Sequence, residues 1–199
     1  MNTSPWWHYQ YSRLLALFKR HDRAIDELRT ALSIDPSYSR ATAALGFLYA
    51  TLGRYPLAIE QFKAALGLRP DDAVLLFDLG YVYHQQKDYG QAVEAFKKSV
   101  GLAPRNDRAW YGMGLALSSL GRHEESAQAL HEAAILQPMN SLAWYELGMT
   151  YHTLNRREKL DQVIAHLNRF DPKVTQHLIR ATAPPEPLAG QRGTVATPQ

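Results

Sequence analysis

Large apolar residues recur along this chain at a constant spacing of 34 residues, each ahead of a proline. The prolines keep this spacing over four intervals, as Pro36, Pro70, Pro104, Pro138 and Pro172. Eight residues before them stand Leu28, Phe62, Phe96, Leu130 and Ile164. A fixed period of this length indicates a helix–turn–helix unit that is copied and stacked.

Small residues keep the same period and predict a close contact between the two helices of each unit. The position 24 residues before the proline holds Ser12, Gly46, Gly80, Gly114 and Gly148. The position 12 before it holds Ala24, Ala58, Ala92, Ser126 and Leu160. Because a helical glycine costs about 1 kcal/mol relative to alanine, four in register need a packing reason. We expect the small residues to let two antiparallel helices approach, and the fifth unit to pack differently at Leu160.

The pattern predicts five helix pairs. Their approximate ranges are 5–18 with 21–34, 40–52 with 55–68, 73–86 with 89–102, 107–120 with 123–136, and 141–154 with 157–169. The proline is expected to end the second helix, because the residue before a proline is pushed out of the α region.

Turn residues support these boundaries. Gly53 and Gly121 stand where a first helix has to end, and glycine is the usual left-handed stop there. The equivalent positions in the other units hold Lys19, Lys87 and Asn155. The expected N-caps of the following first helices are Ser39, Asp72, Asn106 and Ser141.

Two units together carry a known repeat motif. The fifth has the spacing W-x2-L-G-x2-Y, as Trp144, Leu147, Gly148 and Tyr151, and the second continues with Ala58, Phe62 and Pro70. In these residues the chain resembles the tetratricopeptide repeat family over about residues 5–172. The resemblance implies an all-α, right-handed α-solenoid of five antiparallel helix pairs, and it indicates little about function.

The expected domain organisation follows the repeats. One repeat domain is predicted over residues 1–180, with repeats at about 5–38, 39–72, 73–106, 107–140 and 141–174. Residues 173–180 are predicted to form a short capping helix, in which Val174, Leu178 and Ile179 cover the last repeat. Residues 181–199 contain several prolines and glycines and few large apolar side chains, which predicts a disordered tail.

Composition narrows the class of partner. The chain of 199 residues has a formal net charge of +3, with acids and bases interleaved, so the basic blocks typical of nucleic-acid binding are missing. It contains no cysteine, which excludes disulfides, thiolate nucleophiles and zinc sites built on sulfur. The sequence shows no signal peptide and no apolar run long enough for a membrane span. We expect a cytoplasmic protein without membrane insertion.

The histidines invite a metal or catalytic hypothesis, but their positions argue against it. His84 and His152 share one position of their repeats and lie two repeats apart. Successive repeats stack about 10 Å apart, so one ion cannot bridge them. His123 and His131 have no carboxylate–histidine arrangement, and the nucleophile elbow, P-loop and HExxH motifs are missing. We expect no catalytic residue, no metal and no cofactor.

The better candidate site is the inner wall of the solenoid, lined by the first helices. Tyrosine, tryptophan and arginine are enriched in binding hot spots, and this wall is rich in aromatic residues and arginine. The predicted groove residues are Tyr9, Arg13, Arg40, Phe47, Phe77, Asp78, Tyr81, His84, Arg108, Tyr111, Tyr145, Glu146, Met149 and His152. Phe47, Tyr81 and Met149 have the alternative of being partly buried between neighbouring first helices.

The aromatic N-terminus has two interpretations. Trp7 and Tyr11 would bury against the next helices and stabilise this end, or Trp6 and Tyr9 would belong to a binding face. Both could hold.

The groove residues also indicate the type of ligand. Members of the tetratricopeptide repeat family that grip chaperone C-termini carry Lys and Asn in the groove, whereas this chain has aromatic residues and arginine there. A carboxylate clamp is therefore not expected. An extended or helical segment with apolar side chains fits better, with Arg13, Arg40 and Arg108 setting its orientation.

The leading hypothesis is a non-enzymatic adaptor or scaffold that binds a peptide or helix of a partner protein in the groove. One alternative is a self-assembling oligomeric scaffold, suggested by the atypical terminal repeats. Another is a co-chaperone or accessory subunit of an enzyme or of a secretion or assembly complex, which would use the same groove.

Overall fold

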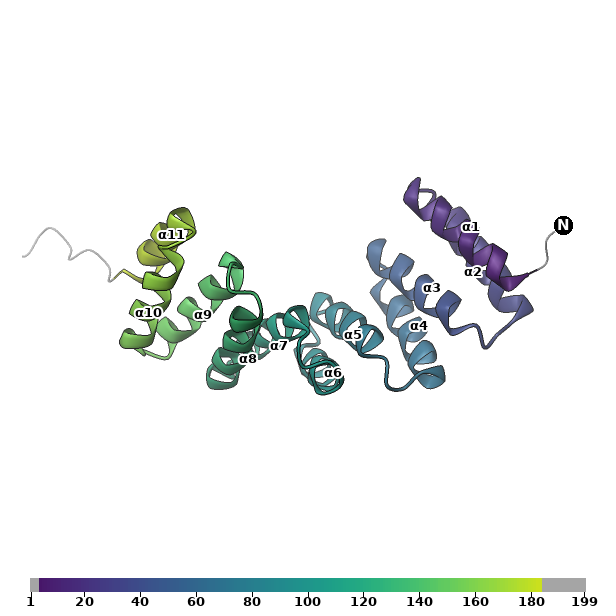
Figure 1. Cartoon of the computed structure of the whole chain (residues 1–199). Helices are drawn as coiled ribbons and strands as arrows, with labels where there is room; N and C mark the ends of the chain where they lie inside the picture. The colour runs from purple at the N-terminus through teal and green to yellow at the C-terminus, as the bar shows by residue number, and fades with distance from the viewer. Residues whose placement is uncertain (1–3, 184–199) are drawn as a thin grey trace, which may run out of the picture.

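The computed structural model describes residues 4–183, and this part of the chain is helical throughout, without a strand. Its helices are α1 (Pro5–Leu17), α2 (His21–Ile34), α3 (Ser39–Thr51), α4 (Tyr55–Leu68), α5 (Ala73–Gln85), α6 (Tyr89–Leu102), α7 (Asp107–Ser119), α8 (His123–Leu136), α9 (Ser141–Thr153), α10 (Arg157–Leu167) and α11 (Pro172–Thr182). Ten of them form five antiparallel pairs, from α1 with α2 to α9 with α10, and α11 follows alone (Figure 1). The predicted all-α solenoid is confirmed.

The pairs stack in chain order into an open arch (Figure 1). The first helices of the pairs contact one another along the inside, and the second helices α4, α6 and α8 lie on the outer side. Each second helix from α2 to α8 also packs against the first helix of the next pair. Packing contacts between helices join only units that are neighbours along the chain, as is typical of repeat arrays. The first helices of successive units therefore form one long inner surface.

The two helices of a pair approach closely at the repeated glycine. A Cβ added at Gly80 would lie 2.8 Å from Cδ1 of Phe96, and one at Gly114 would lie 2.6 Å from Cγ of Leu130. The expected packing reason for the glycines is therefore present. The nearest atoms, however, belong to the large residue of the second helix. Ala92 is fully buried, but the ring of Phe96 is what occupies the space beside Gly80.

All five predicted ends of the first helices have a left-handed backbone. Their φ angles are 57° at Lys19, 70° at Gly53, 64° at Lys87, 73° at Gly121 and 54° at Asn155. The next N–H then folds back onto the helix, as where Arg54 donates to the carbonyl of Tyr49 at 2.8 Å. Non-glycine residues adopt this conformation only at an energetic cost, so the repeat geometry outweighs residue preference at three of these positions.

The predicted N-caps are right in two repeats and wrong in two. Asp72 and Asn106 cap α5 and α7 with their side chains. Ser39 and Ser141 are the first helical residues of α3 and α9, whose N-caps are Tyr38 and Asn140. The four observed caps keep the 34-residue spacing that the two serines break.

The fifth pair ends differently from the others. Helix α10 stops at Leu167, and Pro172 begins α11 instead of ending a second helix, so the expectation for this proline is wrong. The Asp171 side chain caps α11 by accepting a hydrogen bond from the Val174 N–H at 3.1 Å. Proline is tolerated there because the first turn of a helix needs no N–H from it.

Helix α11 covers the end of the last repeat. Leu178 is fully buried and fills the space beside Gly148, where an added Cβ would lie 2.7 Å from its Cδ2. Ile179, also expected to cover this repeat, is instead exposed. The helix includes Ala181 and Thr182, the first two residues of the predicted tail, and residues 184–199 lie outside the described part.

Within residues 4–183, no helix combines the length and the apolar character that crossing a membrane requires. The same part of the chain contains no group of three or more His, Asp or Glu side chains arranged to hold a metal ion.

Candidate functional site

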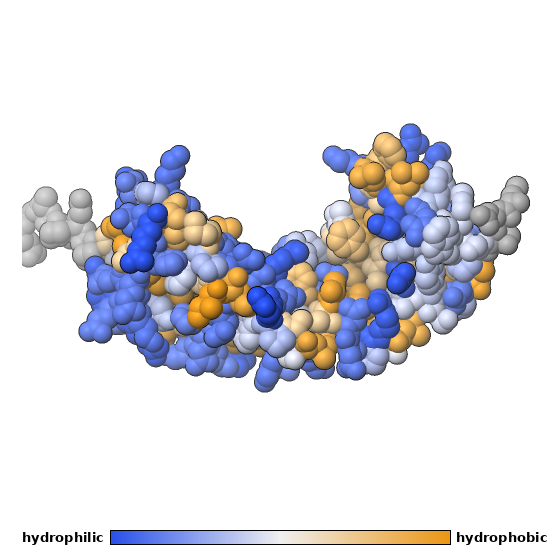
Figure 2. All heavy atoms as spheres, viewed as in Figure 1, coloured by the Kyte–Doolittle hydropathy of each residue, from blue (hydrophilic) through white to orange (hydrophobic). Residues whose placement is uncertain are grey.

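Three neighbouring cavities follow the hollow inner side of the arch (Figure 2). The first, of about 570 Å³, lies between α1, α3 and α5, and the second, of about 540 Å³, between α3, α5 and α7. The third, of about 310 Å³, lies between α5 and α7. Phe47 and Asp78 line both the first and the second, while Phe77, Tyr81 and Arg108 line both the second and the third. The cavities therefore form one continuous groove, called here the inner groove.

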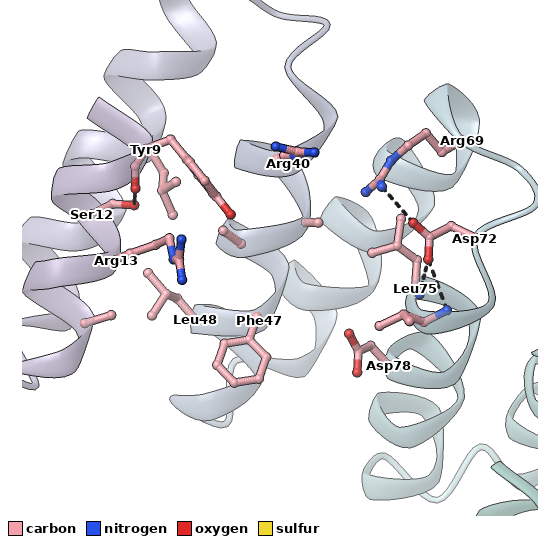
Figure 3. A pocket seen from close by; sticks show the side chains of 15 residues that line it. Tyr9, Ser12, Arg13, Arg40, Phe47, Leu48, Arg69, Asp72, Leu75 and Asp78 are labelled. Atoms are coloured by element: carbon pink, nitrogen blue, oxygen red, sulfur yellow. Dashed lines mark hydrogen bonds and ion pairs between the residues drawn. The ribbon is translucent and has the colours of Figure 1, made fainter. Parts of the chain in front are cut away.

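The first cavity combines an apolar floor with charged side chains (Figure 3). Ser12, at the position that glycine holds in later repeats, is buried and donates a hydrogen bond to the carbonyl of Tyr9 at 2.7 Å. Arg13 lies over the Tyr9 ring, 5.9 Å from its centroid. Asp78 faces the cavity from α5 (Figure 3).

Aromatic side chains dominate the second and third cavities. The Arg108 guanidinium lies 4.9 Å from the centroid of Phe77, which in turn packs against Phe96 with a centroid distance of 5.9 Å. The hydroxyl of Tyr81 accepts a hydrogen bond from the side-chain amide of Gln85 at 2.7 Å. An arginine over an aromatic ring is held by cation–π attraction, so Arg108 is pre-positioned at the groove.

Asp78 is the most perturbed carboxyl group of the groove. Burial raises its pKa to about 6, the Arg108 charge opposes this shift and Asp72 adds to it. Within residues 4–183, no basic side chain comes within 4.0 Å of its carboxylate. The groove thus contains a half-buried acid for which the described chain provides no ion-pair partner.

Ten of the predicted groove residues lie in these cavities. They are Tyr9, Arg13, Arg40, Phe47, Phe77, Asp78, Tyr81, His84, Arg108 and Tyr111. Phe47 and Tyr81 are 59% and 47% exposed, so neither is buried between first helices. Tyr111 is partly buried against the C-terminal core, and this burial together with the nearby Glu146 raises the pKa of its hydroxyl.

The other four predicted residues, Tyr145, Glu146, Met149 and His152, lie on α9, beyond the three cavities. Tyr145 stacks on His177 of α11 at a centroid distance of 5.4 Å, and Met149 packs against the C-terminal core. Burial raises the pKa of Glu146. Helix α11 packs against both α9 and α10, so part of the expected wall is an intramolecular contact.

The N-terminal aromatic residues do not bury against the next helices as the first interpretation expected. Trp7 and Tyr11 stack on each other within α1 at 5.1 Å and remain exposed, at 37% and 36%. Tyr9 lines the first cavity and contacts the Tyr38 ring edge-on at 5.5 Å. Trp6 is exposed at 58% and is not among the residues lining that cavity.

Several lining residues were not expected from the sequence. Ala43 and Ala44 form part of the first cavity's floor, and Arg69 and Asp72 reach it from the loop between α4 and α5. The alanines stand one turn before Phe47 on the same helix, a signal that the helical period carries. The ion pair between Arg69 and Asp72, at 2.8 Å, depends on the loop conformation and has no comparable signal.

Comparison with protein families supports the repeat assignment. Three family models, each described as a tetratricopeptide repeat, match residues 8–38, 43–107 and 83–147. No curated protein matches the chain.

Solved structures of similar fold are numerous. YrrB, described as a repeat protein with an unusual peptide-binding site, is 22% identical with a TM-score of 0.76, covering 87% of this chain and 90% of its own. MamA from Desulfovibrio magneticus RS-1 is 22% identical with a TM-score of 0.76, covering 91% and 98%. PilF from Pseudomonas aeruginosa is 19% identical with a TM-score of 0.74, covering 89% and 83%. At this level of identity the likeness shows the fold.

Proposed function

Because the chain belongs to the tetratricopeptide repeat family, we propose that it is a non-enzymatic adaptor that binds a segment of another protein in its inner groove. The observation that carries this proposal is the continuity of the three cavities across the first four repeats. A continuous groove accommodates a long segment, whereas a small-molecule site is usually one enclosed pocket.

The composition of the groove supports a protein ligand. Phe47 and Tyr81 project apolar surface into it at low conformational-entropy cost, as binding hot spots do. Arg13, Arg40 and Arg108 add charges that can orient a bound segment. The peptide-binding site ascribed to the structurally similar YrrB is consistent with such a role.

A pull-down with a matched control tests the groove. Tagged chain is used to recover partners from the native cell, beside the Phe47→Ala/Tyr81→Ala variant. The control is Leu57→Ala/Ile135→Ala, which removes similarly exposed apolar side chains from the second helices α4 and α8. We expect a partner that wild type and control retain and the groove variant loses, with all three proteins equally helical by circular dichroism. A partner retained by all three would place binding outside the groove.

The identity of the recovered protein separates the adaptor role from that of an accessory subunit. Both roles use the same groove, so a client of an enzyme or of a secretion or assembly complex would indicate the accessory role.

Self-assembly is a second candidate, favoured by the exposed apolar face of α1. Leu14 is 49% exposed, whereas Leu48, Val82 and Ala116 at the equivalent positions are buried against the preceding repeat. Leu17 and Phe18 are exposed as well, at 77% and 67%, and Figure 2 shows hydrophobic residues gathered at the free tip of α1. End repeats normally carry a polar outer face for solubility, so this face would be covered in an oligomer.

Light scattering tests this second candidate. If two copies associate through α1, the molar mass rises with concentration above that of one 22.5 kDa chain. The Leu14→Glu/Phe18→Glu variant then remains monomeric. A monomeric mass for the wild type at the highest concentration reached would remove the candidate.

A further inference from the structure

The first cavity has opposite charges at its two ends (Figure 3). Arg13 lines it from α1 at the N-terminal end, and Arg40 lines it from α3 in the middle (Figure 3). Asp78 on α5 faces it from the opposite side (Figure 3). A ligand that lies across this cavity therefore meets the two positive charges two repeats and one repeat before the negative charge.

The other two charged residues that line the cavity, Arg69 and Asp72, form an ion pair with each other. Arg69 pairs with Oδ2 of Asp72 at 2.8 Å and donates to the Ser39 hydroxyl at 2.6 Å. Oδ1 of Asp72 accepts from the N–H groups of Val74 and Leu75 at the start of α5. This pair is part of the helix cap and is unavailable to a ligand.

Arg13, Arg40 and Asp78 are available by contrast. Over residues 4–183, no acidic side chain lies within 4.0 Å of either arginine, and no basic one within 4.0 Å of Asp78. Arg13 contacts only neutral groups in its neighbourhood, the Tyr9 ring and the Gln10 side-chain oxygen at 3.3 Å. The Arg108 charge does not offset the burial of Asp78, whose pKa stays raised.

The distance between neighbouring repeats can be compared with the rise per residue of an extended peptide. Neighbouring first helices stack about 10 Å apart, and an extended chain rises about 3.3 Å per residue. One repeat therefore corresponds to about three residues of an extended ligand. Between the charges, the floor consists of Ala43, Ala44, Phe47 and Leu75, which offers apolar contact and no side-chain hydrogen bonds.

We propose that the first cavity binds an extended protein segment with an acidic side chain against Arg13 and Arg40, a basic side chain against Asp78, and apolar residues between them. The acidic and basic residues are about three to six positions apart. This inference rests on the proposed function and adds to it the charge pattern of the bound segment. Charge complementarity of this kind sets register and excludes wrong partners.

A displayed library of random twelve-residue peptides tests the inference without a known partner. The library is selected on the immobilised full chain, and selected peptides are compared by the charge at each aligned position. Four variants are selected in parallel: Asp78→Lys, Arg13→Glu/Arg40→Glu, Phe47→Ala/Tyr81→Ala, and the control Glu124→Lys on the outer helix α8. All five proteins are first matched for helical content and melting temperature.

The expected wild-type consensus has an acidic and a basic position around an apolar stretch. Asp78→Lys should abolish the preference for a base and leave the preference for an acid. The double arginine variant should do the reverse, and Glu124→Lys should change neither. The best wild-type peptide should bind Asp78→Lys about tenfold or more weakly, the scale of one lost charge-assisted hydrogen bond.

Two further results would overturn the inference in distinguishable ways. In the first, the peptides enriched on the wild type are lost with Phe47→Ala/Tyr81→Ala but have the same charge pattern on every charge variant. This result would support binding in the groove and refute the charge assignment. The absence of enrichment over blank support, or enrichment that survives Phe47→Ala/Tyr81→Ala, would refute both the assignment and the proposed function.

Discussion

At the scale of single residues, Asp78 shows how position outweighs residue type. Among the acidic residues within 4–183, Asp78 alone combines placement in the inner groove with a pKa raised to about 6. A half-buried carboxylate without an ion-pair partner disfavours the folded state, because ionisation is easier in the unfolded chain. Such a residue is expected where a site serves binding at the expense of stability.

The pH dependence of stability follows from this shift. Between pH 3.8 and about 6 the folded chain holds more protons at Asp78 than the unfolded chain does, so the free energy of unfolding falls as pH rises through this window. Asp78→Asn should therefore stabilise the protein at pH 7.5 by on the order of 1–3 kcal/mol and have a much smaller effect at pH 4. Melting curves at both pH values measure this.

The control for this variant is Asp71→Asn, which removes the same charge from an exposed loop position. Arg108 and Asp72 are the charged groups that act on Asp78, and both are unchanged in either variant. Equal stabilisation of the Asn variants at pH 7.5 would mean that net charge, and not burial at Asp78, is responsible.

At the scale of helix pairs, the repeated glycine determines how closely two helices pack. Gly80→Leu in α5 forces side-chain atoms into the ring of Phe96, since even a Cβ would lie 2.8 Å from it. Overpacking of this kind costs about 1–3 kcal/mol or more. We expect a clear fall in the melting temperature measured by circular dichroism.

Gly67→Leu is the matched control within another helix. An added Cβ at Gly67 meets no atom within 4 Å, so this substitution gains helix propensity without a clash. It should leave the melting temperature unchanged or raise it. The same loss from both substitutions would contradict a packing role for Gly80.

At the scale of the whole molecule, an extra helix covers the solenoid at its C-terminal end only, within the described residues 4–183. Helix α11 covers the last repeat, with Leu178 against Gly148, whereas α1 exposes Leu14, Leu17 and Phe18. Stability in a repeat array is carried by contacts between neighbouring units, so the loss of a cap acts first on the unit next to it.

Leu178→Ala should consequently destabilise the C-terminal end, by about 2–5 kcal/mol for a buried leucine. Hydrogen exchange should become faster in α9, α10 and α11 and change little in α1 to α4. Uniformly faster exchange along the chain would instead indicate that the array unfolds as one cooperative unit. The exposed Ile179 provides the control, since Ile179→Ala removes a similar side chain from the same helix without opening the core.

The sequence alone determined the repeat, the helix pairs and the positions where first helices end. These features depend on local periodicity and on positions such as those of Gly53 and Gly80, which recur every 34 residues even where another residue type occupies them. It also placed ten of the groove residues on the inner side of the first helices, because a helical face follows from a period of 3.6 residues.

The tertiary structure decided what happens where the repetition stops. Pro172 begins α11, whose N-cap is Asp171, and Tyr145 contacts His177 of this helix. Likewise, the pairing of Arg69 with Asp72 and the unpaired state of Asp78 depend on loop conformation and on distances between repeats. Contacts between segments far apart in the chain are set by packing in three dimensions, and the 34-residue period of the sequence does not predict them.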